Sequence, residues 1–159
     1  MKGMQLLSNG LIDLLHPDAV VLGSDAATNE EIIRVLAGRL EALGYVKGTY
    51  ADAVVRREMA LPTGLPLERA DNVAVPHTDP EHVLKPGIAL GTLKKPVTFA
   101  NMEDPDEALP VGFVFLLAIN DKDKQIDTLQ TVMATIQNPA ALDSLRAATT
   151  FEEVRAILG

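Results

Sequence analysis

Residues 111–119 read Val-Gly-Phe-Val-Phe-Leu-Leu-Ala-Ile, the longest uninterrupted apolar run of this chain. The run is far shorter than the roughly 20 apolar residues that a membrane-spanning helix requires. An apolar run without polar alternation is typical of a strand that is covered on both faces. Residues 111–119 therefore predict the central strand of a sheet with helices above and below it.

Shorter apolar segments between turn-forming residues predict further strands on either side of this run. They are Val20–Leu22, Val73–Val75, Gly87–Leu93 and Val97–Phe99. Residues 101–110 are acidic and carry two prolines, which predicts a loop. Residues 61–66 are also predicted to form a loop, rigid at its prolines and flexible at Gly64.

Apolar residues at helical spacing separate the predicted strands. Capping-box patterns at Thr28/Glu31 and Thr150/Glu153 mark two helix starts, and Gly44 marks a helix end. The predicted helices cover residues 28–44, 49–59, 126–136, 139–147 and 150–158. Residues 6–15 fit either a short helix or a loop.

The composition fits one globular domain. The chain has 159 residues, of which 47% are hydrophobic and 23% charged, enough for one buried core but few for two. Strands that alternate with helices, without an internal repeat, predict an α/β sandwich. We expect a single domain over residues 1–159, with residues 1–10 at its periphery.

Several classes of protein are disfavoured by the composition. The chain has no cysteine, which excludes disulfides, thiolate metal sites and cysteine nucleophiles. The formal net charge of −8 argues against nucleic acid and fits either a basic protein partner or plain solubility. Glycine-rich phosphate loops and the G-x-S-x-G elbow are missing, as is a signal peptide. We therefore expect a cytosolic protein that neither binds ATP nor acts as a serine hydrolase.

The stretch with the clearest chemistry is Asp71–Pro80, Asp-Asn-Val-Ala-Val-Pro-His-Thr-Asp-Pro. Pro76 and Pro80 fix their own φ angles and push the residues before them toward extended geometry. A stiff segment suits an imidazole that must keep one nitrogen aimed at an incoming group. His77 is therefore predicted to be a nucleophile.

Other interpretations of the histidines are open. His77, Asp79 and His82 are residue types that bind metal ions in hydrolases. Pro80 between them and the absence of an H-E-x-x-H spacing argue against that interpretation. His77 is otherwise a loop histidine bonded to backbone. His16 is predicted to lie in a surface turn.

Arg57-Glu58, Thr63-Gly64 and Asn72–Thr78 together resemble the pattern of a known family. It is the fructose/mannitol class of enzyme IIA (EIIA) components of the bacterial phosphoenolpyruvate-dependent sugar phosphotransferase system (PTS). The resemblance covers most of the chain. Segments most similar to the galactitol-type branch are Pro76–Asp79, Glu81–Val83, Lys95–Phe99 with Met102, and Phe113–Ala118. The resemblance implies a single EIIA domain with a mixed sheet of about five strands and helices on both faces.

The resemblance also implies a function. In that family the histidine matching His77 accepts a phosphoryl group from the carrier HPr and passes it to a cysteine of EIIB. EIIB then phosphorylates the sugar during its uptake through the membrane component EIIC. No cofactor or metal is implied, and galactitol or a related polyol is the expected sugar. A regulatory phosphohistidine module that binds a non-transport partner is the alternative.

Four residues are expected to support His77. The neutral ring would attack through Nε2, with Nδ1–H held by a backbone carbonyl. Arg57 is expected to pair with the phosphoryl oxygens, and Thr63 to donate to them through its hydroxyl. Many relatives have a second histidine where this chain has Gln125, which donates a hydrogen bond but carries no charge. His82 is predicted to replace that missing charge.

Overall fold

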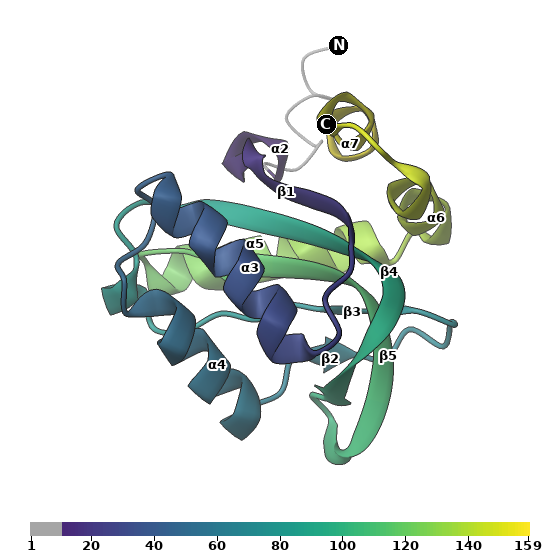
Figure 1. Ribbon diagram of the computed structural model, residues 1–159, viewed down its shortest axis with the longest axis horizontal. Coiled ribbons are helices and arrows are strands. Elements are labelled where there is room, and N and C mark those ends of the chain that lie inside the picture. Colours follow the sequence, from purple (N-terminus) through teal and green to yellow (C-terminus); the bar gives the residue numbers. More distant parts are fainter. Residues whose placement is uncertain (1–10) are drawn as a thin grey trace.

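In the computed structural model, which describes residues 11–159, five strands form one mixed sheet (Figure 1). The strands are β1 (Leu15–Ser24), β2 (Gly64–Leu65), β3 (Asn72–Ala74), β4 (Gly87–Asn101) and β5 (Asp104–Ala118). The sheet confirms the predicted mixed sheet of about five strands. The peripheral position expected for residues 1–10 falls outside the described residues.

Strand β5 lies at the centre of the sheet. It pairs antiparallel with β4 on one side and parallel with β3 on the other. β1 adds to the far side of β4 in parallel, and the short β2 joins β3 to the end of β4. All residues from Val111 to Ile119 are buried, which confirms the prediction of a strand covered on both faces.

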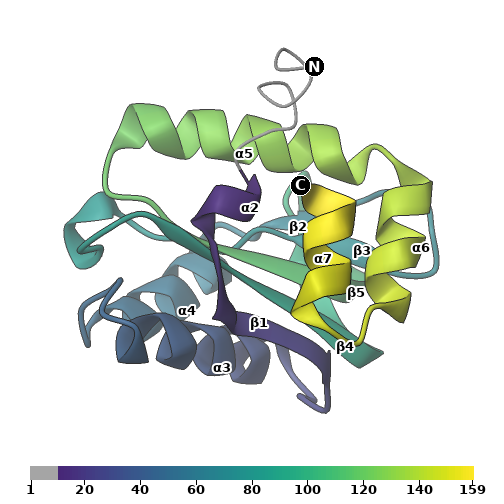
Figure 2. The same cartoon turned by 90° about the horizontal axis from the view of Figure 1, so that it is seen from above.

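Helices cover both faces of the sheet (Figure 2). α3 (Asn29–Ala42) and α4 (Tyr50–Ala60) lie on one face. α2 (Leu11–Leu14), α5 (Lys122–Ile136), α6 (Pro139–Ala147) and α7 (Phe151–Leu158) lie on the other. The predicted α/β sandwich is therefore confirmed. In the described part of the chain, no helix has both the length and the apolar content to cross a bilayer.

The alternation of side chains along β5 divides the core into two apolar clusters. Val114 and Leu116 belong to the cluster beneath α3 and α4. Phe113 and Phe115 belong to the cluster beneath α5, α6 and α7. Successive strand residues point to opposite faces, so one continuous apolar run can supply both cores.

Caps define the ends of several helices. Thr28 Oγ1 accepts from the Glu31 N–H at 3.1 Å, but the Glu31 carboxylate accepts from Ala27 N–H, so only half of that predicted capping box forms. Both halves form at Thr150. Gly44 follows the end of α3 with φ of +81°, a conformation that glycine adopts without steric cost.

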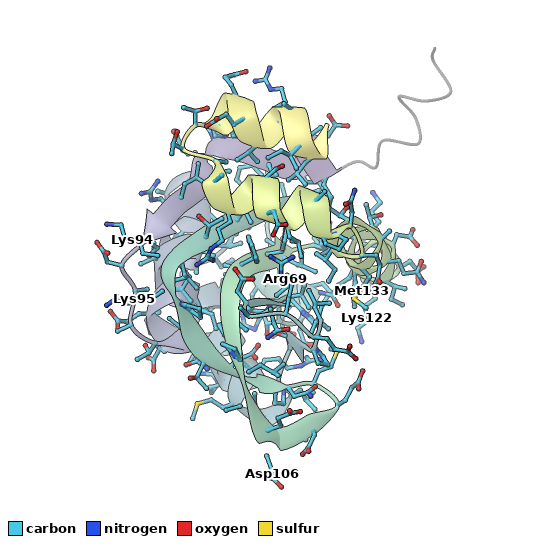
Figure 3. The ribbon with its side chains drawn as sticks, turned by 90° about the vertical axis from the view of Figure 1, so that its right-hand side faces the viewer. Arg69, Lys94, Lys95, Asp106, Lys122 and Met133 are labelled. Atoms are coloured by element: carbon cyan, nitrogen blue, oxygen red, sulfur yellow. The ribbon has the colours of Figure 1, made fainter. Side chains whose placement is uncertain are left out.

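The loop predicted for residues 101–110 is wrong. β4 continues to Asn101 and β5 begins at Asp104, so most of this segment belongs to a β-hairpin. The hairpin extends beyond the rest of the sheet (Figure 1), and Asp106 lies at its tip (Figure 3). A projecting hairpin has a free outer edge, where prolines do not interrupt a hydrogen-bonded ladder.

The prediction that Gly64 is a flexible point is also wrong. It is buried in β2, where it pairs with Ala74 of β3 and Asn101 of β4. A Cβ atom at this position would lie 2.5 Å from the backbone oxygen of Ala100. Glycine is therefore required by close approach of two backbones rather than by flexibility.

The structure decides two predictions for the N-terminal part of the chain. Of residues 6–15, Leu11–Leu14 form the helix α2 and Leu15 begins β1, while residues 6–10 fall outside the described part. His16 lies within β1 rather than in a turn, and its Nδ1 accepts from the Asp18 N–H at 3.0 Å.

Candidate functional site

His77 lies in the segment between β3 and the short 3₁₀ helix η1 (Pro80–His82). Hydrogen bonds hold the two residues before it: Val75 N–H donates to Thr63 Oγ1 at 3.2 Å, and Leu117 N–H donates to Pro76 O at 3.0 Å. The second bond attaches the segment directly to the central strand β5. The hydrogen bonds to the sheet and the fixed φ angles of the prolines thus jointly determine the position of His77.

The orientation of the His77 ring is set by its own backbone. Nδ1 lies 2.8 Å from Val75 O. A carbonyl oxygen only accepts hydrogen bonds, so Nδ1 carries the proton and the neutral ring has its lone pair on Nε2. This is the arrangement that the proposed attack through Nε2 requires.

The environment favours the neutral form of this ring. Burial lowers the pKa of His77 from its usual value of 6.5, and the charge of Arg57 lowers it further. The hydrogen bond to Val75 and the charge of Asp79 act in the opposite direction. At neutral pH the ring is therefore uncharged and nucleophilic.

Arg57 reaches the His77 segment from the last turn of α4. Its Nη1 donates to Asp79 Oδ1 at 3.2 Å, and its side chain is 35% exposed. Arg56, the preceding residue, is exposed. Of these two arginines, the structure therefore brings Arg57 to the His77 segment.

Gln125 reaches the same segment from the opposite helical layer. It lies in the first turn of α5, and its Nε2 donates to Thr78 O at 3.1 Å. Thr78 directly follows His77 in the chain. The structure therefore places Gln125 beside the candidate nucleophile, where a side-chain amide remains a donor to a bound anion.

The hydroxyl of Thr63 was predicted to donate to phosphoryl oxygens, but in the structure it donates to Glu58. Thr63 is buried, and its hydroxyl donates to Glu58 Oε1 at 2.8 Å while it accepts from Val75 N–H. Thr63 therefore contacts the His77 segment through both its hydroxyl and its backbone oxygen, which accept from Val75 N–H. Sequence reasoning gave Glu58 no role, although it belongs to the Arg57-Glu58 pair of the family pattern and is a charged residue on the apolar face of α4.

His82 is oriented toward the other end of α4. Its Nδ1 lies 2.9 Å from Thr49 Oγ1, which precedes the first residue of that helix. Arg57 lies about two helical turns further along. The structure therefore gives the His82 ring a partner outside the group formed by His77, Arg57 and Gln125.

The alternative of a metal site gains no geometric support. The side chains of His77, Asp79 and His82 bond to Val75, Arg57 and Thr49 respectively. Within residues 11–159, no group of three His, Asp or Glu side chains is arranged to hold a metal ion.

Residues 13–159 match the family model described as "Phosphoenolpyruvate-dependent sugar phosphotransferase system, EIIA 2". The match includes the whole candidate site. One relative is the PTS system 2-O-alpha-mannosyl-D-glycerate-specific EIIABC component of Escherichia coli (strain K12), 32% identical over 154 residues. The alignment covers 93% of this chain and 22% of that relative, so this chain spans about a fifth of its length.

A second relative is comparable to this chain in length. The PTS system galactitol-specific EIIA component of Escherichia coli (strain K12) is 26% identical over 123 residues, which cover 77% of this chain and 81% of the relative. Among solved structures, the complex of enzyme IIAMTL and phosphorylated enzyme IIBMTL from Escherichia coli matches with a TM-score of 0.74 and 28% identity. That match covers 91% of this chain and 98% of the solved chain.

Proposed function

This chain belongs to the EIIA 2 family of the phosphoenolpyruvate-dependent sugar phosphotransferase system, and on that basis we propose that His77 carries a phosphoryl group between phospho-HPr and EIIB. The observation that carries the proposal is the contact between His77 Nδ1 and Val75 O. It leaves Nε2 as the nucleophilic atom of a neutral ring beside the cationic Arg57.

In the proposed step, the Nε2 lone pair of His77 forms a bond to phosphorus while the bond from phosphorus to the HPr histidine breaks. The proton on Nδ1 stays in place, and Val75 O stabilises the positive charge that the ring acquires. Transfer to EIIB reverses the roles, because a cysteine sulfur of EIIB attacks phosphorus and His77 leaves as a neutral imidazole. Positioning and charge stabilisation supply most of the catalysis in such in-line transfers.

Arg57 and Gln125 are the proposed partners of the phosphoryl oxygens. Only one guanidinium nitrogen of Arg57 is bonded to Asp79, so its remaining N–H donors are suited to a second anion. Gln125 has a second amide N–H besides the one that it gives to Thr78. The proposal leaves out His82, because its ring is bonded to Thr49, and gives Thr63 a role through Val75.

Exposed apolar side chains lie close to Arg57 and Gln125 in the sequence, and such side chains suit a protein-docking surface. Met59 and Leu61 follow Arg57 and are 79% and 58% exposed, and Ile126 follows Gln125 and is 56% exposed. Apolar and aromatic groups concentrate at the centre of protein interfaces. The net charge of −8 favours association with a basic HPr. Because the proposed exchange is with HPr and EIIB, and through EIIB with EIIC, we propose that the protein acts in the cytoplasm.

The proposed sugar is galactitol or a related polyol. Support comes from the galactitol-specific EIIA relative, which is similar to this chain in length. The relative named for mannosylglycerate shows that specificity differs within the family. Transfer assays with EIIB and EIIC partners of defined sugar specificity would test this choice.

The experiment that tests the phosphoryl transfer uses labelled phosphoenolpyruvate with enzyme I and HPr. We expect one phosphoryl group per chain, labile in acid and stable in alkali, as a phosphohistidine is. His77→Ala should abolish the label, whereas His82→Ala and His16→Ala should retain it. Undiminished label in His77→Ala would refute the proposed nucleophile. A label on His77 that no EIIB cysteine removes would favour the regulatory alternative.

A further inference from the structure

A chain of hydrogen bonds connects a buried carboxyl group to the His77 ring. Glu58 Oε1 accepts from the Thr63 hydroxyl and Glu58 Oε2 accepts from Thr63 N–H, both at 2.8 Å. Thr63 Oγ1 accepts from Val75 N–H at 3.2 Å, and Val75 O accepts from His77 Nδ1–H at 2.8 Å. We propose that Glu58 is a positioning residue that acts through Thr63 and Val75 to keep His77 in the Nδ1–H tautomer.

Glu58 occupies a position that is unfavourable for a carboxylate in an ordinary helix. It is 6% exposed, and burial without hydrogen bonds penalises a charged group. It also lies near the C-terminus of α4, where the helix dipole disfavours negative charge. The bonds from Thr63 compensate for part of this cost, which indicates that the carboxyl group serves a purpose beyond the stability of α4.

Both oxygens of the carboxylate are needed for this arrangement. Each accepts one hydrogen bond from Thr63, and this orients the hydroxyl so that a lone pair of Oγ1 faces Val75 N–H. An amide in place of the carboxylate has an acceptor oxygen on one side only and an NH₂ donor group on the other. With its oxygen on Thr63 N–H, its NH₂ group would face the hydroxyl, which would then have to turn its own proton elsewhere.

The position of Val75 decides the tautomer of His77. A neutral histidine exchanges between Nδ1–H and Nε2–H forms, and the hydrogen bond at one nitrogen selects between them. Thr63 holds the N–H of Val75, and Leu117 holds the carbonyl of the next residue, Pro76. Val75 N–H also donates to the backbone oxygen of Thr63 at 3.4 Å, so loss of the shorter bond to the hydroxyl weakens one of the two attachments that aim Val75 O at the ring.

The tautomer is measurable without any partner protein, so this inference rests on the proposed function only for its effect on phosphoryl transfer. We would record ¹⁵N NMR spectra of histidine-labelled protein at about pH 8. Burial raises the pKa of Glu58 to about 7, so the carboxyl group is ionised there. His77→Ala identifies the signals of this ring.

The variants are Glu58→Gln, Thr63→Val, which removes the hydroxyl at nearly constant volume, and Thr63→Ser, which retains it. Glu153→Gln is the matched control, because Glu153 also accepts N–H and O–H bonds from threonines but does so at the exposed start of α7. We expect wild type, Thr63→Ser and Glu153→Gln to show the Nδ1–H tautomer. Glu58→Gln and Thr63→Val should gain Nε2–H and accept phosphate from phospho-HPr about tenfold more slowly.

Several outcomes would overturn the inference. A fully retained Nδ1–H tautomer in folded Glu58→Gln or Thr63→Val would refute the hydrogen-bond chain. If Glu58→Gln does not fold, equal tautomer populations in Thr63→Val and Thr63→Ser would do the same. A tautomer shift without slower transfer would refute a role in the reaction. Absence of any wild-type phosphorylation together with the expected tautomers would instead count against the proposed function alone.

Discussion

Arg56 and Arg57 are adjacent and chemically identical, yet only Arg57 contacts the His77 segment through Asp79. We predict that Arg57→Ala slows phosphorylation of His77 by phospho-HPr more than tenfold. A lost charge-assisted pair to a transition-state oxygen costs about 2–4 kcal/mol. Rapid-quench labelling would measure the rate, with Arg56→Ala as the matched control. Equal losses in both variants would mean that these arginines serve only the end of α4.

Glu58 should also leave a signature in the pH dependence of stability. Burial raises its pKa from 4.5 to about 7, so between these values the folded protein binds more protons than the unfolded chain. The stabilisation from this group is complete below the unfolded value and is lost as the pH rises through about 7. Between pH 5 and pH 8, wild type should lose roughly 2–3 kcal/mol more than Glu58→Gln.

Urea unfolding of both proteins at the two pH values would measure this difference. His77 contributes the opposite slope, because its pKa is lowered in the folded state and the unfolded ring protonates below 6.5. The comparison is therefore repeated in a His77→Ala background, where that contribution is absent. Parallel stability profiles for wild type and Glu58→Gln would show that the carboxyl group titrates normally in the fold.

At the scale of elements, the two-residue strand β2 depends on the absence of a side chain at Gly64. Its Cβ would lie 2.5 Å from Ala100 O and 3.3 Å from Leu109 Cδ1. Gly64→Ala should therefore lower the free energy of unfolding by about 1–3 kcal/mol. Gly38→Ala is the control, because nothing lies within 4 Å of a Cβ at that position in α3.

The control substitution should raise stability by about 0.5–1 kcal/mol, since alanine loses less conformational entropy than glycine in a helix. Chemical denaturation of the two variants gives both values. A neutral effect of Gly64→Ala would indicate that β2 and β4 can separate without cost.

At the scale of the whole molecule, Asp71 connects the helix α6 to the sheet. Its side chain is 7% exposed and accepts from Arg146 of α6 at 2.6 Å and from Arg69 at 3.0 Å. Arg69 also pairs with Asp143 of α6 at 2.8 Å, and it lies next to the C-terminal helices in Figure 3. The network therefore connects the start of β3, the strand that precedes His77, with the helix α6.

We predict that Asp71→Asn lowers the free energy of unfolding by about 2–3 kcal/mol, because hydrogen bonds between charged groups are lost. Asp106→Asn, at the exposed tip of the hairpin, should change it by less than about 0.5 kcal/mol. Thermal unfolding of the two variants would compare them. A similar small change in both would mean that apolar packing alone holds α6 in place.

The sequence by itself determined the α/β class, the central strand at 111–119 and the ends of most helices. These features depend on patterns within a few residues, namely apolar periodicity and the bonds between a capping side chain and the next turn. The hairpin at 101–110 was not predicted, because it forms by pairing of two strands whose acidic and proline residues locally favour a loop. The sequence also singled out His77 from its flanking prolines and its resemblance to a family.

Only the tertiary structure decided which partner each polar group has. Gln125 reaches Thr78 across 47 residues and Arg57 reaches Asp79 across 22, while His82, five residues from His77, turns to Thr49. The role proposed for Glu58 rests on its two hydrogen bonds to Thr63, which only the structure shows. Such choices depend on the register of the sheet and on which helix covers which face. Those are set by packing of the whole core, so no local pattern in the chain encodes them.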